Sequence, residues 1–354
     1  MRLLSAKGWT VYSCGHVSAG PGVDDSAGFF LVDILDVDAV ASLVEELGVD
    51  MLYSVGSDIA MPTVAAVSER LGLPLFHSSE LIEVLHRKVN LRGFFAEHHI
   101  SEVPYAVLRS AADVAGFDAY PAIVKPSDSQ GQRGITVVAD AEEAIAALDD
   151  AIAASHTASA VIEKFLDGPE VSVHVFVVDG IVKFFLPSDR IVWDGPAVGV
   201  PAAHALPAEF LQPGDAEEIR RLVVATVDAL GVTTGPLYFQ LKMTAEGPRV
   251  IEIAPRLDGC HLWRLVEFAT GFNILERCFD LLAGASWVEA SDDVAHAVRL
   301  DFLLGSPDQA FDPDQWPAPE ARVLFEEHQV EPGALPRSIN PVVTRLGYRI
   351  VATN

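Results

Sequence analysis

A predicted β-hairpin in the second half of the chain restricts the fold more than any other feature. Residues 236–244 and 249–253 are rich in strand-forming side chains and flank the turn Ala245-Glu246-Gly247-Pro248. Pairing of the two strands allows Gln240 and Glu252 to meet on one face of a sheet. Two oxygen donors there suit Mg²⁺, which usually keeps several waters and also binds substrate phosphates. The hairpin therefore predicts a metal site.

The end of this hairpin reads Glu252-Ile253-Ala254-Pro255-Arg256 and adds a cation. Pro255 stops the strand, and Arg256 follows Glu252 by four residues, which places a positive charge near a metal-bound phosphate. We predict that Arg256 is catalytic and steadies charge that develops in a transition state. A buried Glu–Arg pair with a purely structural role is the alternative.

The charge of the chain excludes several classes of partner. Its 354 residues include 24 Lys and Arg against 50 Asp and Glu, a net charge of −26, whereas a nucleic-acid surface needs clustered basic residues. No apolar run is long enough to cross a bilayer, the first residues lack the pattern of a signal peptide, and three scattered cysteines suit a reducing compartment. We expect a cytoplasmic protein without nucleic-acid or membrane partners.

The first ~80 residues alternate short apolar strands with helices, which is typical of a parallel α/β layer. We expect strands at residues 9–13 and 50–54 and helices at residues 38–47 and 61–71. Residues 3–8 resemble the tail of a helix whose preceding strand is absent, so the sheet either begins one strand short or has that strand upstream.

The rest of the chain mixes strands and helices. A Pro- and Gly-rich stretch, residues 187–214, is predicted to be an irregular loop that covers a substrate pocket. The other expected elements are helices at 81–98, 141–154 and 217–230, and strands at 121–125, 135–138, 160–165, 171–178, 181–186 and within 339–352.

Two lysines and a small-residue loop are candidates for phosphate binding. Lys125 closes a strand and precedes the loop 126–134, whose backbone N–H groups are suited to phosphate oxygens. The loop residues singled out are Ser129, Gly131 and Arg133. Lys88, on the helix 81–98, is the second candidate. An ordinary surface lysine is the alternative for each of the two.

Residues 163–166 form a strand end that is a candidate for binding a nucleobase. Such an edge offers one carbonyl and one N–H group to an adenine, and Glu170, four residues after Leu166, is within reach of ribose hydroxyls. A plain strand and turn is the alternative interpretation.

In this order, the motifs resemble the ATP-grasp superfamily over residues 50–285. The resemblance implies an α/β and α+β fold with an N-terminal Rossmann-like (pre-ATP-grasp) domain at 1–84, either without its first strand or with that strand upstream. An ATP-grasp domain would follow at 85–285, with a smaller lid lobe at about 105–165, and 286–354 would complete the large lobe. It also implies ATP and Mg²⁺, or Mn²⁺, as cofactors. Lys88 and Lys125 would bind phosphates, and Lys125 would be catalytic together with Arg256. Glu163, Lys164 and Leu166 would bind the adenine, and Glu170 the ribose.

Two positions depart from the family pattern. Many members carry Glu or Asp where Gln240 stands, although members similar to carbamoyl phosphate synthetase use Gln. The family usually reads Glu-x-Asn-Pro-Arg, and here Ala254 replaces the Asn. The replacement removes one oxygen ligand of a second Mg²⁺, whose place a water is expected to take.

The segment after Arg256 resembles carboxylate–amine ligases, including L-amino-acid ligases. Asp258, His261 and Arg264, with Arg190 from the predicted loop, are candidate substrate-binding residues. The resemblance implies an ATP-dependent ligase that activates a carboxylate as an acyl phosphate and joins it to an amine. The alternatives are phosphorylation of bicarbonate or carbamate, as in carbamoyl phosphate synthetase, and a non-catalytic nucleotide-binding pseudoenzyme. A homodimer is the usual expectation for a soluble enzyme.

Overall fold

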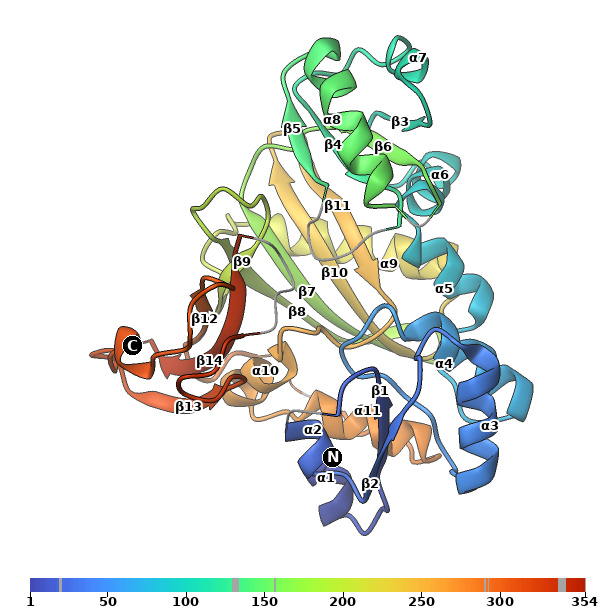
Figure 1. Ribbon diagram of the computed structural model, residues 1–354, viewed down its shortest axis with the longest axis vertical. Coiled ribbons are helices and arrows are strands. Elements are labelled where there is room, and N and C mark those ends of the chain that lie inside the picture. The colour runs from blue at the N-terminus through green and yellow to red at the C-terminus, as the bar shows by residue number, and fades with distance from the viewer. Residues whose placement is uncertain are drawn as a thin grey trace.

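The computed structural model describes residues 1–18, 21–128, 134–155, 157–289, 291, 293–336 and 342–353. Within them lie a large sheet of eight strands, a small sheet of four and a two-stranded sheet near the N-terminus (Figure 1). The small sheet stands at one end of the large sheet and the N-terminal elements lie at the other. No helix in the described ranges is long and apolar enough to cross a membrane.

The large sheet has the strand order β11-β10-β7-β8-β9-β12-β14-β13. Its neighbouring pairs are antiparallel. The bounds are β7 (Glu170–Val178), β8 (Ile181–Val192), β9 (Pro201–Leu206), β10 (Gly235–Thr244), β11 (Gly247–Ala254), β12 (Val298–Gly305), β13 (Val323–His328) and β14 (Thr344–Ala352).

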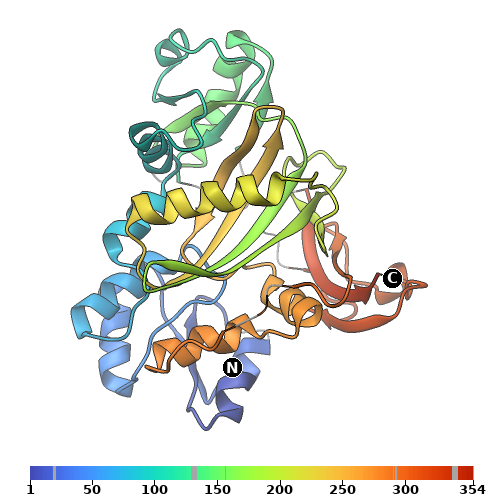
Figure 2. The ribbon, with the colours of Figure 1, turned by 180° about the vertical axis from the view of Figure 1, so that it is seen from behind.

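Helices cover both faces of the large sheet. The helix α9 (Asp215–Leu230) crosses one face (Figure 2), and α10 (Leu262–Thr270) and α11 (Ile274–Leu282) lie on the other. Alternation along β7 explains the two cores, because successive side chains of a strand point to opposite faces. Val175 belongs to the apolar cluster that includes residues of α9, and Phe176 to the cluster that includes residues of α10 and α11.

The small sheet has the order β3-β6-β4-β5, and its own apolar cluster includes residues of α7 and α8. The bounds are β3 (Tyr105–Leu108), α7 (Ala111–Val114), β4 (Ala122–Pro126), β5 (Thr136–Val138), α8 (Ala141–Ala153) and β6 (Ala160–Lys164). Asp140 caps α8 by accepting hydrogen bonds from the N–H groups of Glu142 and Glu143, both at 3.0 Å, which fixes where this alanine-rich helix begins.

The N-terminal elements are built around the parallel pair β1–β2. Their bounds are α1 (Arg2–Ala6), β1 (Tyr12–Gly15), α2 (Pro21–Asp24), β2 (Gly28–Leu31), α3 (Val37–Leu47), α4 (Met61–Leu71), α5 (Ser79–His86) and α6 (Lys88–His98). Elsewhere, a short 3₁₀ helix, η1 (Pro313–Gln315), lies between β12 and β13. The helix predicted at 61–71 is confirmed, and Gly72 ends it in the left-handed conformation.

The predicted irregular loop at residues 187–214 is wrong. The strand β8 runs on to Val192, and β9 lies inside the same stretch. Its prolines suggested a loop, but Pro201 opens β9, where a missing N–H is tolerated. At Pro187, β8 pairs with β7 on one side, and its pairing with β9 on the other side begins only at Asp189. Pro187 therefore stands where one edge of the strand is unpaired, and a missing N–H group is tolerated there. Arg190 consequently lies on a strand and not on a flexible cover.

Three other boundaries differ from the predictions. The helix expected at 81–98 is two helices, because Arg87 has an extended backbone between α5 and α6. The first strand begins at Tyr12 instead of residue 9. Residues 50–54 form no strand, and the alternate side chains Met51 and Tyr53 pack against the apolar cluster of α10 and α11. Their apolar alternation reflects that packing and not strand pairing.

Candidate active site

Two cavities adjoin beside the large sheet. The hinge cavity, about 450 Å³, lies between the small and large sheets and includes residues 164–166 in its lining. The β14 cavity, about 370 Å³, extends over the large sheet as far as β12 and β14. The residues that line both cavities are Lys88, Ile135, Arg190, Gln240 and Glu252. A ligand in the hinge cavity can therefore meet a ligand in the β14 cavity at these side chains.

Lys125 lies in the hinge cavity within a buried charge cluster. Its Nζ atom donates to Oε2 of Glu163 at 2.7 Å, and Arg92 donates to the same oxygen at 3.0 Å. Arg92 also donates to the carbonyl of Val250 at 2.8 Å, which links α6 to β11. Two cations thus share one carboxylate oxygen, which leaves an excess of positive charge where phosphates could bind.

Burial and neighbouring charge shift the pKa values of this cluster. Burial lowers the pKa of Lys125 to about 8, because the lost hydration outweighs the attraction of Glu163. Burial by itself would raise the pKa of Glu163, but the charges of Arg92 and Lys125 outweigh it and hold that pKa at about 2. The carboxylate is therefore ionised at neutral pH, and the lysine titrates not far above it.

Glu170 is the centre of a second charge cluster, at the wall of the hinge cavity. It pairs with Arg190, its register partner on β8, and its Oε1 atom lies 3.6 Å from Nζ of Lys242, its register partner on β10. Gln240 donates from Nε2 to Oε2 of Glu170 at 2.9 Å. The strand order places β7 between β8 and β10, and this order brings the four side chains together.

Gln240 and Glu252 are register partners on β10 and β11, as the hairpin predicted. A β-bulge follows at once, since Leu241 pairs with Val250 and leaves Ile251 as the extra residue. Because Nε2 of Gln240 binds Glu170, the amide oxygen is available on its other side. No group of three or more His, Cys, Asp or Glu side chains in the described ranges could hold a metal ion. A metal here would need oxygens from Gln240, Glu252, a ligand and water.

Arg256 is buried and binds the N-terminal part of the chain. Its guanidinium pairs with Asp58 and donates to the carbonyl of Leu257 at 2.6 Å, and its Nε atom has no hydrogen-bond partner. Beside it, Gly56 and Gly259 touch backbone to backbone, because a Cβ on Gly259 would lie 2.5 Å from the carbonyl oxygen of Gly56. Arg256 and Asp58 line the β14 cavity.

Lys88 is the first residue of α6 and lines both cavities. Its N–H group donates to the carbonyl of Ser127 at 3.2 Å, which joins the start of α6 to the end of β4. A helix N-terminus favours anions, so the backbone and the side chain act in the same direction here. The predicted loop residues Ser129, Gly131 and Arg133 lie outside the described residues.

Residues 164–168 connect the small sheet to the large one. The N–H groups of Lys164 and Phe165 donate to the carbonyls of Pro104 and Pro121 at 2.9 and 2.8 Å. Leu166 lines the hinge cavity. Gly168 has φ +131°, and a Cβ on it would lie 1.9 Å from the carbonyl oxygen of Met243. The connection therefore requires glycine at this position.

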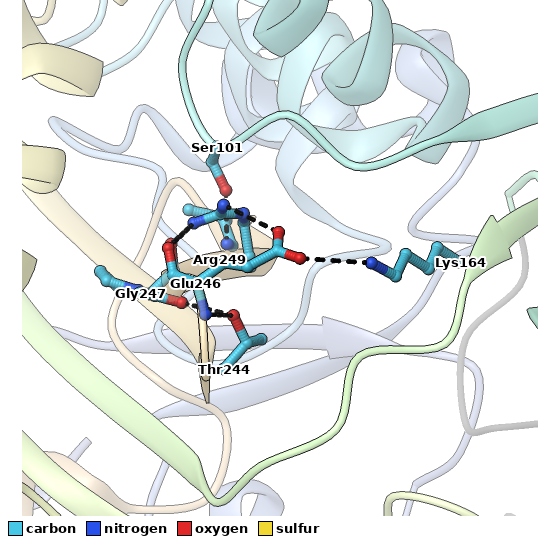
Figure 3. A network of polar contacts seen from close by, with 8 residues as sticks. Ser101, Lys164, Thr244, Glu246, Gly247 and Arg249 are labelled. Atoms are coloured by element: carbon cyan, nitrogen blue, oxygen red, sulfur yellow. Dashed lines mark hydrogen bonds and ion pairs between the residues drawn. The ribbon is translucent and has the colours of Figure 1, made fainter. Parts of the chain in front are cut away.

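The side chain of Lys164 points to the tip of the β10–β11 hairpin (Figure 3). Its Nζ atom lies 3.5 Å from Oε1 of Glu246, which also lies 3.5 Å from Arg249 through its other oxygen. Ser101 accepts a hydrogen bond from the N–H group of Val250 at 2.7 Å and ties the same hairpin to the segment after α6. The side chain of Lys164 thus contacts protein, although the residue lines the hinge cavity.

The candidate substrate residues separate into two groups. Asp258 lines the β14 cavity, accepts a hydrogen bond from the N–H group of Cys260 at 2.6 Å, and has a pKa raised by burial. His261 stacks on Tyr348 with ring centroids 4.5 Å apart, and the Arg264 guanidinium lies 3.7 Å from the ring centroid of Phe325. Neither His261 nor Arg264 is among the described residues that line the two cavities.

The sequence reasoning missed three cations, Arg92, Lys242 and Arg345, that line these cavities. A signal for Arg92 existed, since it follows Lys88 by four residues and so shares its face of the helix. Lys242 lies two residues after Gln240 on the same strand, which also predicts a shared face. Nothing local marks Arg345, which the fold brings to the site from β14.

Comparison with known proteins defines the class of fold. Residues 87–259 match the family described as phosphoribosylglycinamide synthetase, ATP-grasp (A) domain. An L-amino acid ligase from Bacillus licheniformis superposes with a TM-score of 0.79 at 18% identity, covering 99% of this chain and 89% of that one. The chain has the ATP-grasp fold, and its resemblance to the ATP-grasp superfamily is confirmed.

Several sequence relatives are ligases, and one is a synthase. The phosphoribosylamine–glycine ligase of Caulobacter vibrioides is 28% identical over 264 residues, 69% of this chain and 61% of that protein. The carbamoyl phosphate synthase large chain of Rubrobacter xylanophilus is 25% identical over 302 residues, 82% of this chain and 26% of that protein. The chain spans about three fifths of the length of the first of these relatives.

Proposed function

We propose that this protein is an ATP-dependent ligase that activates a carboxylate as an acyl phosphate and joins it to an amine, releasing ADP and phosphate. The observation that carries the proposal is the meeting of two cavities at Lys88, Gln240 and Glu252. A nucleotide in the hinge cavity would present its γ-phosphate to an acid in the β14 cavity. The three-domain division, the cytoplasmic location and the homodimer remain predictions.

The hinge cavity supports ATP binding in this proposal. The N–H groups of Lys164 and Phe165 are used within the protein, so Leu166 would offer its backbone to the adenine edge. Glu170 would accept from ribose hydroxyls. Lys125 and Lys88 would bind the phosphates, favoured by the excess positive charge around Glu163.

Gln240 and Glu252 fit a Mg²⁺ or Mn²⁺ ion. They are register partners at the junction of the cavities, and the amide of Gln240 is oriented by its hydrogen bond to Glu170. Two protein oxygens with phosphate oxygens and water make up the coordination that Mg²⁺ prefers. The ion would neutralise charge on the β- and γ-phosphates. Ala254 supplies no oxygen, so a second ion would be held more weakly.

The reaction needs no side-chain nucleophile. A carboxylate oxygen of the acid would attack the γ-phosphorus as the bond to ADP breaks. The amine nitrogen would then attack the carbonyl carbon of the acyl phosphate, and phosphate would leave with the amine proton. Arg256, buried at the wall of the β14 cavity, would stabilise negative charge during these steps.

ADP release tests the proposal. Purified protein with ATP and Mg²⁺ is offered a panel of amino and hydroxy acids, each with and without an amine, and ADP is measured by a coupled assay. We expect one acid–amine pair to stimulate ADP formation and to yield an amide detectable by mass spectrometry. ATP binding without stimulation by any acid plus amine would refute the ligase proposal.

Gln240 favours one alternative, in which bicarbonate or carbamate is the phosphorylated acid. The position carries Gln in the carbamoyl phosphate synthetase-like pattern, and a carbamoyl phosphate synthase large chain is among the sequence relatives. This alternative predicts bicarbonate-dependent ADP formation in the absence of any other acid. ADP formation is compared in buffer depleted of carbonate and in buffer supplemented with bicarbonate. If bicarbonate does not increase ADP formation, this alternative is excluded.

A further inference from the structure

Arg345 is a half-buried cation on β14 that the proposed reaction does not use. It lines the β14 cavity, and its guanidinium lies 4.9 Å from the ring centroid of Phe302, which lines the same cavity. Its Nη1 atom is buried and has no hydrogen-bond partner. A buried donor without a partner costs free energy, and a ligand that accepts from it would recover that cost.

A β-bulge turns Arg345 toward the cavity. Along β12 and β14 the register runs regularly to Leu303 and Gly347, and then Leu304 pairs with Arg345, so Leu346 is the extra residue. Leu346 packs in a separate apolar cluster with Leu303. Arg345 thereby shares a face with Leu304, and both line the cavity. Bulges often re-aim a side chain beside a binding site.

Arg345 has no carboxylate within ion-pair distance in the described ranges, although its charge acts from farther away to lower the pKa of Asp258 in the same cavity wall. The other two arginines of the cavity wall, Arg190 and Arg256, pair with Glu170 and Asp58. Arg345 forms no ion pair with a residue of the described ranges, although the chain has 50 acidic residues against 24 Lys and Arg. An anion from outside the protein would give this guanidinium the close ion pair that the described residues do not supply.

Arg345 and the proposed metal ligands lie on strands that are far apart in the order of the large sheet. Gln240 and Glu252 lie on the neighbouring strands β10 and β11, and Arg345 lies on β14. Four strands, β7, β8, β9 and β12, separate β10 from β14 in the large sheet. One carboxylate near Gln240 is therefore not placed to reach Arg345 as well. A substrate that reaches both must carry a second acceptor group.

We propose that Arg345 is a substrate-binding residue that takes a second anionic group of the acid substrate, a carboxylate or a phosphate. This inference rests on the proposed ligase function, in which the first carboxylate meets the γ-phosphate. The β14 cavity of about 370 Å³ has room for on the order of a dozen non-hydrogen atoms. The substrate class is thus a small acid with two anionic ends.

Matched pairs of acids test the inference by binding. L-glutamate and L-glutamine, L-aspartate and L-asparagine, and O-phospho-L-serine and L-serine differ in the second anionic group. Their dissociation constants are measured calorimetrically on the full chain with a non-hydrolysable ATP analogue and Mg²⁺. We expect one anionic member to bind at least about tenfold more tightly than its neutral partner, as for a charge-assisted hydrogen bond. The glutamate and phosphoserine arms distinguish carboxylate from phosphate.

Variants assign the preference to Arg345. Arg345→Gln should abolish the difference within the pair while the affinity for the ATP analogue stays unchanged, and Arg345→Lys should keep part of it. Arg322→Gln, which removes an exposed arginine outside the cavity lining, should behave as wild type. Equal binding within every pair, or a preference that survives Arg345→Gln, would overturn the inference.

The binding experiment also separates this inference from the proposed function. Selective binding that depends on Arg345, without ADP formation by any acid plus amine, would retain the site and reject the ligase. The opposite outcome is ADP formation with an acid whose dissociation constant and KM are the same in wild type and Arg345→Gln. This outcome would support the proposed ligase function and overturn the assignment of Arg345 as a substrate-binding residue.

Discussion

The guanidinium of Arg256 pairs with the carboxylate of Asp58 across 198 residues of sequence. The pair joins the segment after β11 to the segment before α4, at the wall of the β14 cavity. Together with the contact between Gly56 and Gly259, it makes the N-terminal part of the chain one wall of the candidate site.

Asp58→Asn should lower both stability and turnover. The variant keeps the size of the side chain but leaves the Arg256 charge buried without its partner, which we expect to cost about 2 kcal/mol of unfolding free energy. Urea unfolding measures the loss. The control is Asp38→Asn, whose pair with Arg70 is exposed and is expected to contribute below about 0.5 kcal/mol. Equal effects of the two variants would mean that the Asp58 pair has no special role.

Lys125→Ala should abolish ADP formation, because the variant removes a phosphate-binding cation. A second test needs no loss of activity and uses the lowered pKa of Lys125, about 8. Phosphates favour the ammonium form, so ATP binding at pH 8 should take up protons, and the ATP affinity should fall as the pH rises above 8. Calorimetry in buffers of different ionisation enthalpy measures the uptake. Lys125→Arg should remove it, and an uptake that persists in this variant would belong to another group.

Glu252→Ala should abolish turnover, because the variant removes a proposed metal ligand. Titration of the wild type with Mg²⁺ or Mn²⁺ should show metal-dependent ADP formation that chelation by EDTA reverses. Wild-type activity in Glu252→Ala would show that the metal binds elsewhere.

Glu170→Ala should mainly weaken ATP affinity. The structure adds a second effect, since Glu170 also accepts from Gln240 and pairs with Arg190. We therefore expect KM for ATP to rise about tenfold or more, with a smaller fall in kcat. A change in kcat alone would contradict ribose binding by this carboxylate.

Gly168→Ala should destabilise the connection between the two sheets. The added Cβ would meet the carbonyl of Met243 at a backbone φ of +131°. The control is Gly180→Ala, at φ +75° with no atom within 4 Å of the new Cβ, where backbone strain acts alone. We expect Gly168→Ala to cost at least about 2 kcal/mol more than the control. Similar melting temperatures of the two variants would show that the segment relaxes freely.

Ala254→Asn tests whether the missing oxygen limits metal binding. Ala254 is buried and is the register partner of Tyr238 on β10. The larger, polar asparagine side chain should therefore lower the melting temperature. In an active ligase the same variant should lower the Mg²⁺ concentration needed for half-maximal ADP formation. A wild-type protein without activity that gains it in Ala254→Asn would support the pseudoenzyme interpretation.

The sequence by itself determined those parts of the site that lie close together along the chain. Gln240 and Glu252 follow from one hairpin, because a short turn sets which residues of two adjacent strands face each other. The local apolar pattern likewise predicts the strand that Lys125 closes. The helix α4 is predicted by its own apolar pattern and by Gly72 at its end.

Only the tertiary structure decided the contacts between distant segments. Glu170 meets Gln240, 70 residues away, because β7 lies between β8 and β10, and local periodicity contains no information on strand order. The same limit made residues 187–214 a predicted loop, although their strands gain partners from β7 and β12. Arg345 reaches the cavity because a bulge in the C-terminal strand turns it there. Local propensity sets the elements, whereas the burial of their apolar faces sets which elements become neighbours.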